Sequence, residues 1–191
     1  MMKAKNKPTK RRRVQQKESP RSVAVFPGSF DPLTNGHVDI IERSLKIFDR
    51  IVIGVLDNPA KQGLLSAQER VNLIAAQFSR YRGKVEVHSF SGLLVEFAQT
   101  LGARVIIRGL RAISDFDYEA QMALVNRNLT PSVETFFLTA REEHSYISST
   151  VVKQVALLGG DVSTMVPGVV ARALHQKYLE KRKQKPLIGP V

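Results

Sequence analysis

The sequence predicts an α/β protein in which five parallel strands form one doubly wound sheet, with helices on both faces and a C-terminal helix. Two observations support this. From Ser22 onwards, short apolar runs alternate with segments whose apolar residues recur at helical spacing. The second run, from Arg50 to Leu56, is continuously apolar around one Gly, as is typical of a parallel strand buried on both faces. A chain of 191 residues suits one domain with a sizeable core.

The predicted elements follow one another in a regular order. Strands are expected at 22–27, 50–56, 84–90, 104–107 and 134–138, and helices at 36–48, from 66, at 93–101, at 115–129, from 148 and at 167–180. Ser66 and Glu69 form a capping box, and Gly102 ends the helix before it. Right-handed crossovers in such a Rossmann-like sheet bring the loops after the strands to one edge. Ligands bind at this edge, where the strand order reverses.

The net charge of +12 lies at the two ends of the chain. Residues 1–21 carry nine Lys or Arg and one Glu, and residues 172–191 carry six and one. Residues 22–171 carry fourteen Lys or Arg against fifteen Asp or Glu. We therefore expect disordered basic tails at 1–21 and 181–191 around a folded domain of residues 22–180. The tails could bind nucleic acid, but the nearly neutral body argues against a nucleic-acid-binding protein.

The composition also excludes several classes of protein. The chain has no cysteine, which excludes disulfides, thiol catalysis and cysteine-bound zinc. No apolar run approaches the roughly 18 residues of a membrane helix. There is no apolar core of a signal peptide either. We expect a soluble, cytoplasmic protein that has no membrane partner.

The first strand, loop and helix have the sequence of an anion-binding site. The strand from Val23 to Phe26 ends at Pro27-Gly28, and Gly36-His37 opens the next helix. Backbone N–H groups and the helix dipole favour an anion at such a helix N-terminus, where His37 would contact it. A tight connection with a surface histidine is the simpler alternative. The density of Pro-Gly, Asp-Pro, Asn-Gly and His within eleven residues favours a functional site, although neither nucleotide-binding glycine motif is present.

Phosphate-compatible residues follow four of the five predicted strands. Taken singly, each also has a structural explanation, such as a solvated lysine, an arginine at a sheet edge or a helix cap. Together they favour phosphoryl or nucleotidyl transfer by positioning and charge stabilisation, because no covalent nucleophile with a base is evident. The residues are Ser29, Phe30 and His37, then Lys61, then Arg108 and Arg111, then His144 and Ser148, Ser149 and Thr150.

Three ordered motifs carry a resemblance to a known family. Residues 27–37, ending in Thr34-Asn35-Gly36-His37, resemble the first signature of the nucleotidyltransferase superfamily, and residues 147–150 resemble the second. The segment from Ile107 to Ala112, followed by an acidic helix start at 115–119, is similar to the phosphopantetheine adenylyltransferase branch. The likeness runs from about residue 23 to 179, and covers neither tail.

The resemblance implies a reaction. The phosphate of 4′-phosphopantetheine would attack the α-phosphorus of ATP in line, giving dephospho-coenzyme A and pyrophosphate without a covalent enzyme intermediate. This is the penultimate step of coenzyme A synthesis. Mg²⁺ would arrive with ATP, since no carboxylate cage for a metal is apparent. The resemblance also implies a homohexamer.

Residue roles follow from the same likeness. His37 would stabilise the transition state, and Lys61 and Arg108 would fix the attacking phosphate. ATP would also contact Ser29 and Phe30, then Gly109, Leu110, Arg111 and Glu119, then His144, Ser145, Tyr146, Ile147, Ser148, Ser149 and Thr150. The pantetheine substrate would contact the Ser29 hydroxyl, Leu94 and Asn126.

Three positions depart from the commonest family pattern. Ser29 replaces a frequent Thr and keeps the hydroxyl, His144 stands where Trp is common, and Gln154 where Glu is common. Within the superfamily, a glycerol phosphate cytidylyltransferase and a nicotinamide mononucleotide adenylyltransferase are the alternatives. The arginines at 108 and 111 with the acidic helix start argue against both.

Overall fold

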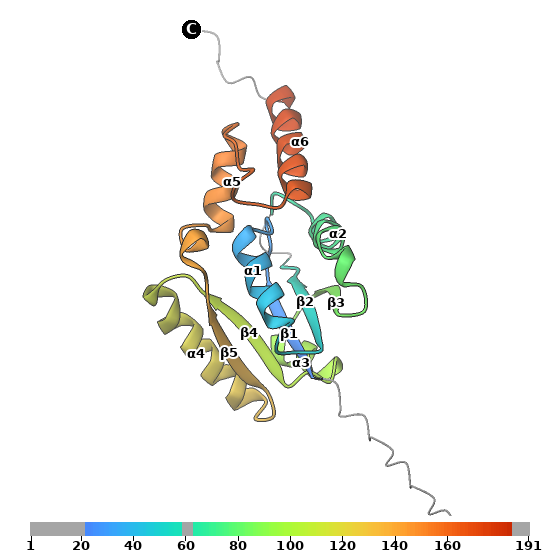
Figure 1. Ribbon diagram of the computed structural model, residues 1–191, viewed down its shortest axis with the longest axis vertical. Coiled ribbons are helices and arrows are strands. Elements are labelled where there is room, and N and C mark those ends of the chain that lie inside the picture. Colours follow the sequence, from blue (N-terminus) through green and yellow to red (C-terminus); the bar gives the residue numbers. More distant parts are fainter. Residues whose placement is uncertain (1–21, 59–62, 185–191) are drawn as a thin grey trace, which may run out of the picture.

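A single sheet of five parallel strands forms the centre of the protein (Figure 1). The computed structural model describes residues 22–58 and 63–184. The strands lie in the order β3-β2-β1-β4-β5 and all neighbours pair in parallel. They are β1 (Val23–Gly28), β2 (Arg50–Leu56), β3 (Val85–Phe90), β4 (Val105–Leu110) and β5 (Glu134–Thr139).

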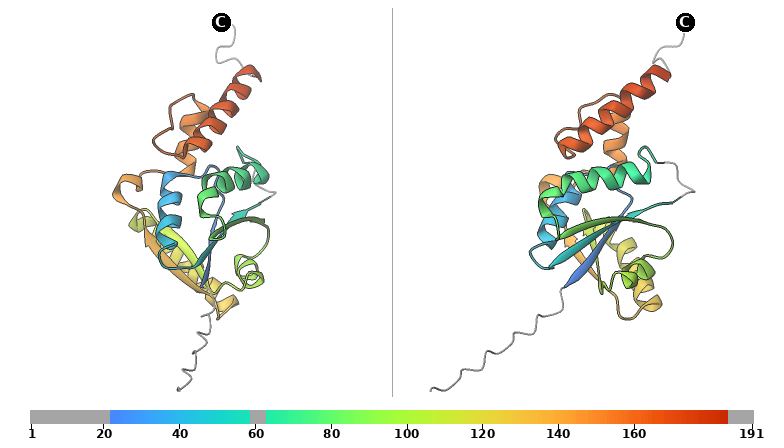
Figure 2. Two further views of the ribbon diagram at one scale, coloured as in Figure 1. Left: turned by 45° about the vertical axis from the view of Figure 1, so that its right-hand side comes forward. Right: turned by 90° about the vertical axis from the view of Figure 1, so that its right-hand side faces the viewer.

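Helices cover both faces of the sheet, which confirms the predicted fold class (Figure 2). On one face lie α1 (Asn35–Ser44) and α2 (Ala67–Gln77), and on the other α3 (Leu94–Thr100) and α4 (Ile113–Leu129). Beyond the carboxyl ends of the strands lie α5 (Ser149–Leu157) and α6 (Gly168–Gln184). The described residues also form two short 3₁₀ helices, η1 (Ser79–Tyr81) and η2 (Glu142–His144).

The core has a layer on each side of the sheet because successive strand residues point to opposite faces. Ile51 and Ile53 of β2 pack into the cluster that contains residues of α1, α2, α5 and α6. Val52, between them, packs instead with Ala98 of α3. All three β2 side chains are fully buried, and each such burial stabilises the fold by about 1.5–3 kcal/mol.

Several boundaries differ from the sequence prediction. β4 continues through residues 108–110, which were predicted as a loop, because Arg108 and Gly109 keep their register with Phe137 and Leu138 of β5. α1 ends at Ser44 rather than near residue 48, and α4 begins at Ile113 rather than 115. α6 continues to residue 184, four residues into the range predicted as a C-terminal tail. The predicted tail of residues 1–21 and the loop residue Lys61 lie outside the described residues.

The strand order reverses between β1 and β4. From β1 the chain adds β2 and β3 on one side, then crosses to add β4 and β5 on the other. The loops after β1 and β4 therefore diverge at the carboxyl edge and leave a crevice, which is where ligands bind in open sheets of this kind.

Candidate active site

A cavity of about 540 Å³ opens at this reversal point. The ends of β1 and β4, the N-terminal turns of α1 and α5 and the first turns of α4 form its walls. Eleven residues predicted for the site line it, namely Ser29, His37, Arg108, Gly109, Arg111, Glu119, His144, Ile147, Ser148, Ser149 and Thr150. The structure thus brings together residues from both signatures and from the segment that links them.

His37 is held in the first turn of α1 by an unusual capping box. The backbone N–H of Thr34 donates to His37 Nδ1 at 3.0 Å, and the Thr34 hydroxyl lies 2.9 Å from the same nitrogen. The His37 N–H in turn donates to Thr34 Oγ1 at 3.4 Å. Because Nδ1 accepts a backbone hydrogen bond, the ring proton of the neutral imidazole lies on Nε2. The Nε2–H group is then the donor that His37 can offer to the cavity.

The charge state of His37 follows from its surroundings. Burial, together with the positive charges of Arg111 and Arg108, lowers the pKa of His37 to about 4. The rings of Phe30 and Phe26 lie 5.2 and 6.2 Å away, and both present edge-on geometry to the imidazole. His37 is therefore a neutral hydrogen-bond donor at neutral pH, not an imidazolium.

The side chain of Phe30 has a structural role beside the backbone contact predicted for this residue. Its side chain is buried against His37, and its backbone adopts a left-handed φ of 48°. This geometry requires glycine at position 28, because a Cβ there would lie 2.9 Å from Phe30 Cζ. The ring of Phe30 packs edge-on against the imidazole of His37. The contact predicted between the Phe30 backbone N–H and ATP stays a prediction.

The two predicted arginines are both paired with carboxylates of α4. Arg108 makes a two-pronged ion pair with Glu119, at 2.6 Å from Nε and 2.5 Å from Nη2, and also donates to the Pro27 carbonyl. Arg111 pairs with Asp115 at 3.1 Å, and this pairing keeps the pKa of the Asp115 carboxyl below its usual range despite the opposing effect of burial. The guanidinium groups are thus oriented before any ligand arrives.

The second signature places another helix N-terminus at the cavity. The Ser148 hydroxyl accepts from the Val151 N–H at 3.1 Å and caps α5, as the sequence predicted. The Ser149 hydroxyl donates to the Pro32 carbonyl at 2.8 Å, which fixes α5 against the loop between β1 and α1. Two helix N-termini therefore face one cavity, a combination that favours phosphate groups.

Other predicted contacts do not line this cavity. Leu110 lies at the end of β4, Ser145 bonds to the carbonyl of Glu142 and Tyr146 is exposed. Leu94 packs against buried residues at the start of α3, and Asn126 is buried near the end of α4. Lys61 lies outside the described residues. The contacts predicted for these residues stay predictions.

Sequence reasoning missed three buried charged residues that shape the site. Arg70 of α2 donates to the carbonyls of Ser29 and Leu56 and so joins the ends of β1 and β2. Asp31 accepts from the backbone N–H groups of Leu64 and Leu65 and from Lys153 Nζ. Burial alone would raise the pKa of Asp31, but Lys153 and the two N–H groups lower it overall.

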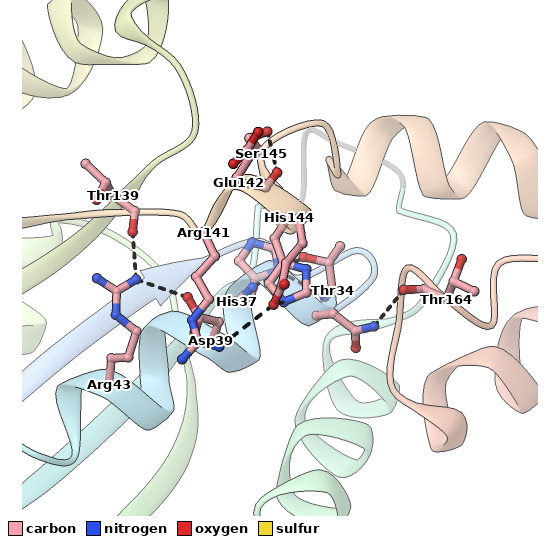
Figure 3. Close-up of polar contacts among 12 residues, drawn as sticks. Thr34, His37, Asp39, Arg43, Thr139, Arg141, Glu142, His144, Ser145 and Thr164 are labelled. Atoms are coloured by element: carbon pink, nitrogen blue, oxygen red, sulfur yellow. Dashed lines mark hydrogen bonds and ion pairs between the residues drawn. The ribbon is translucent and has the colours of Figure 1, made fainter.

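The third is Asp39 of α1, which pairs with two arginines (Figure 3). In the sequence, Asp31 could have been singled out only because it precedes a proline in the loop after the first strand. Asp39 could have been singled out only because it lies two residues after His37. Neither pattern reveals a partner that lies far along the chain.

Residues 22–58 and 63–184 contain neither a cluster of metal-binding side chains nor a membrane-spanning helix. No group of three or more His, Asp or Glu in these ranges could hold a metal ion. No helix there has the length and apolar character to cross a membrane.

The comparisons with known proteins agree with the fold and the site. The family model described as cytidylyltransferase-like matches residues 25–155. A solved structure of a Vibrio parahaemolyticus protein, assigned as a nicotinate-nucleotide adenylyltransferase, superposes with a TM-score of 0.60 over 82% of this chain and 99% of that one. Its sequence identity of 20% supports the fold alone. The fold and the site thus define a nucleotidyltransferase of the cytidylyltransferase-like class.

Closer relatives narrow the class. The phosphopantetheine adenylyltransferase of Alkaliphilus metalliredigens is 52% identical over 155 residues, which cover 81% of this chain and 98% of the relative. That of Coxiella burnetii is 52% identical over 165 residues, or 86% of this chain and 99% of the relative. The chain belongs to the phosphopantetheine adenylyltransferase family.

Proposed function

We propose that the protein transfers the adenylyl group of ATP to 4′-phosphopantetheine, giving dephospho-coenzyme A and pyrophosphate. One observation carries the proposal. A neutral imidazole, two oriented guanidinium groups and two helix N-termini line a single cavity, in a chain that belongs to this family. That set suits an in-line phosphate displacement, in which the protein supplies position and charge stabilisation.

The chain's own residues would divide the work. His37 would donate from Nε2–H to the α-phosphate as negative charge builds on its oxygens, while Thr34 holds the ring in place. Arg108 would bring the attacking phosphate dianion close to the polyanionic nucleotide, and Lys61 would assist it. The N-terminal turn of α5 would hold the remaining ATP phosphates, and Arg111 and Glu119 would contact the nucleotide.

Arg108 must share its guanidinium between Glu119 and the incoming phosphate. The ion pair occupies Nε and Nη2, and Nη1 contacts the Pro27 carbonyl. These contacts use three of the five guanidinium N–H groups, so one donor on each Nη remains for the phosphate. The negative charge of Glu119 orients Arg108 but tempers its attraction for the acceptor. Mg²⁺ bound to the ATP phosphates would neutralise part of their negative charge. Asp115 and Glu119 are the carboxylates in the cavity lining that could contact the ion or its water ligands.

Assembly and compartment are also proposals. Apolar side chains are exposed along α4, which supports association of copies through this helix. These residues are Ile113, Phe116, Tyr118, Met122, Leu124, Val125 and Leu129. A homohexamer would have six times the 21.3 kDa mass of one chain, which light scattering would resolve. The cysteine-free composition agrees with a cytoplasmic protein.

The decisive experiment is a pyrophosphate-release assay with a panel of nucleotides and acceptors. We expect turnover with ATP and 4′-phosphopantetheine. Turnover with CTP and glycerol 3-phosphate, or with ATP and nicotinamide mononucleotide, and none with 4′-phosphopantetheine, would disprove the proposal. Nucleic-acid binding through the tails is the alternative of another class, and it predicts salt-dependent binding that disappears when residues 1–21 and 181–191 are removed.

A further inference from the structure

A buried carboxylate lies beneath one wall of the cavity and is not part of its lining. Asp39 is on α1, and its side chain is only 8% exposed. Arg43 Nη1 lies 3.0 Å from Asp39 Oδ2, and Arg141 Nε lies 2.9 Å from Oδ1 (Figure 3). Each carboxylate oxygen therefore has its own guanidinium partner, one from the same helix and one from the segment that follows β5.

The two arginines join α1 to the segment of residues 139–148. Arg43 Nη1 also donates to the Thr139 carbonyl at 2.7 Å, at the last residue of β5. Arg141 is two residues further on, and its carbonyl accepts from the His144 N–H at 2.9 Å. The arginine pair thus fixes this segment at its start, before it reaches the cavity.

The same segment then forms a cavity wall. Ala140, His144, Ile147 and Ser148 line the cavity, although Arg141 and Asp39 do not. His144 lies across the first turn of α1, where a Cβ placed on Gly36 would come within 3.5 Å of His144 Cβ. The wall therefore packs directly on the turn that holds His37, and the position of one depends on the other (Figure 3).

Arg141 is not needed to complete the helix or the sheet. Its side chain is 57% exposed, so water could solvate it elsewhere, and its other carboxylate neighbour is Glu143 at 3.8 Å. Asp39 is different, because a buried carboxylate that lost a partner would be poorly solvated. Because the buried carboxylate of Asp39 needs a positively charged partner, it favours the conformation in which Arg141 and residues 139–148 pack on α1.

We propose that Asp39 and Arg141 are positioning residues that hold residues 139–148 over α1 in the arrangement that binds the nucleotide. This inference rests on the proposed function, which assigns this wall to ATP. The acceptor phosphate is assigned to a different group, Arg108 of β4, which is not part of this segment. Loss of the Asp39–Arg141 ion pair should therefore weaken binding of the nucleotide and leave binding of the acceptor nearly unchanged.

The test compares Arg141→Ala with a matched control, Arg127→Ala. Arg127 is 58% exposed and pairs with Glu134 at the other end of β5, away from the cavity lining. For Arg141→Ala we expect KM for ATP to rise about three- to tenfold, with kcat and the KM for 4′-phosphopantetheine within about twofold of wild type. Arg127→Ala should leave all three constants unchanged, and Arg141→Lys should recover part of the loss.

Calorimetry of ATP binding without acceptor separates this inference from the proposed function. If the wild type binds ATP but does not turn over 4′-phosphopantetheine, the proposed function is wrong. The ATP affinity of Arg141→Ala still tests whether the Asp39–Arg141 ion pair positions the nucleotide-binding segment. In the Asp39→Asn background, Arg141→Ala should have little additional effect. An ATP affinity of Arg141→Ala within twofold of wild type, an equal rise in both KM values, or additive effects in the double variant would overturn the inference.

Discussion

The most direct consequence of the site geometry concerns replacement of His37 by alanine. Only the Nε2–H group can serve a ligand, because Nδ1 is occupied by the Thr34 N–H at 3.0 Å. The variant therefore removes one fixed donor from the place where charge develops on the α-phosphate. Loss of one such donor typically costs about 2.7–4 kcal/mol of transition-state stabilisation, or roughly 10²–10³ in kcat. KM should change little, since the ground state loses less than the transition state does.

The assay is pyrophosphate release at saturating ATP and 4′-phosphopantetheine. His144→Ala is the matched control, because His144 is the other imidazole that lines the cavity, and we expect its kcat to stay within about tenfold of wild type. A large rise in KM at nearly normal kcat for His37→Ala would assign His37 to ground-state binding. That result would refute the argument from the capping box.

The charge state of His37 provides an independent check. With a pKa of about 4, only about one His37 in 10³ carries a second ring proton at pH 7. The neutral form is then the working form, and kcat should show no titration of this group between pH 6 and 8. Histidine ¹⁵N spectra should report a protonated Nε2 and a bare Nδ1 down to about pH 5. A protonated Nδ1, or a kcat that falls tenfold per pH unit above 5, would contradict this account.

Two further predictions concern stability. Asp31 has a lowered pKa, so its contribution is present above about pH 4 and is lost as pH falls through the folded pKa. Asp31→Asn should therefore lower the free energy of unfolding at pH 7 by about 2–4 kcal/mol, with a smaller difference at pH 3 in urea titrations; an equal difference at both would contradict it. In Gly54→Ala, the added Cβ would lie 2.8 Å from Phe97, whose ring stacks on Phe90 at 4.4 Å. We expect a loss of about 1–3 kcal/mol, and an unchanged Tm would show that the stacked pair can move.

The alternation of strands and helices could be predicted from the sequence because apolar periodicity and helix caps each depend on residues that are close together in the chain. The capping box at Ser66 and the cap at Ser148 are both present in the structure, since each depends on a hydrogen bond over three residues. The continuous apolar run of β2 predicted a strand buried on both faces, and residues 51–55 are all buried.

Boundaries were predicted less well, because neighbouring strands decide where a strand ends. β4 continues to Leu110 only because β5 lies alongside it and offers backbone partners. No residue between Arg104 and Leu110 signals this continuation in the sequence.

The sequence by itself determined that Ser29, His37, Arg108 and the turn at Ser148 belong to one site. Strand-end loops in a parallel sheet must meet at one edge, so their order along the chain was enough. Only the tertiary structure decided how these groups are held. Arg108 pairs with Glu119, His37 is fixed as a neutral donor, and Asp31 reaches Lys153, 122 residues away. Charge pairing and burial depend on which segments pack together, and short-range patterns carry no information about that.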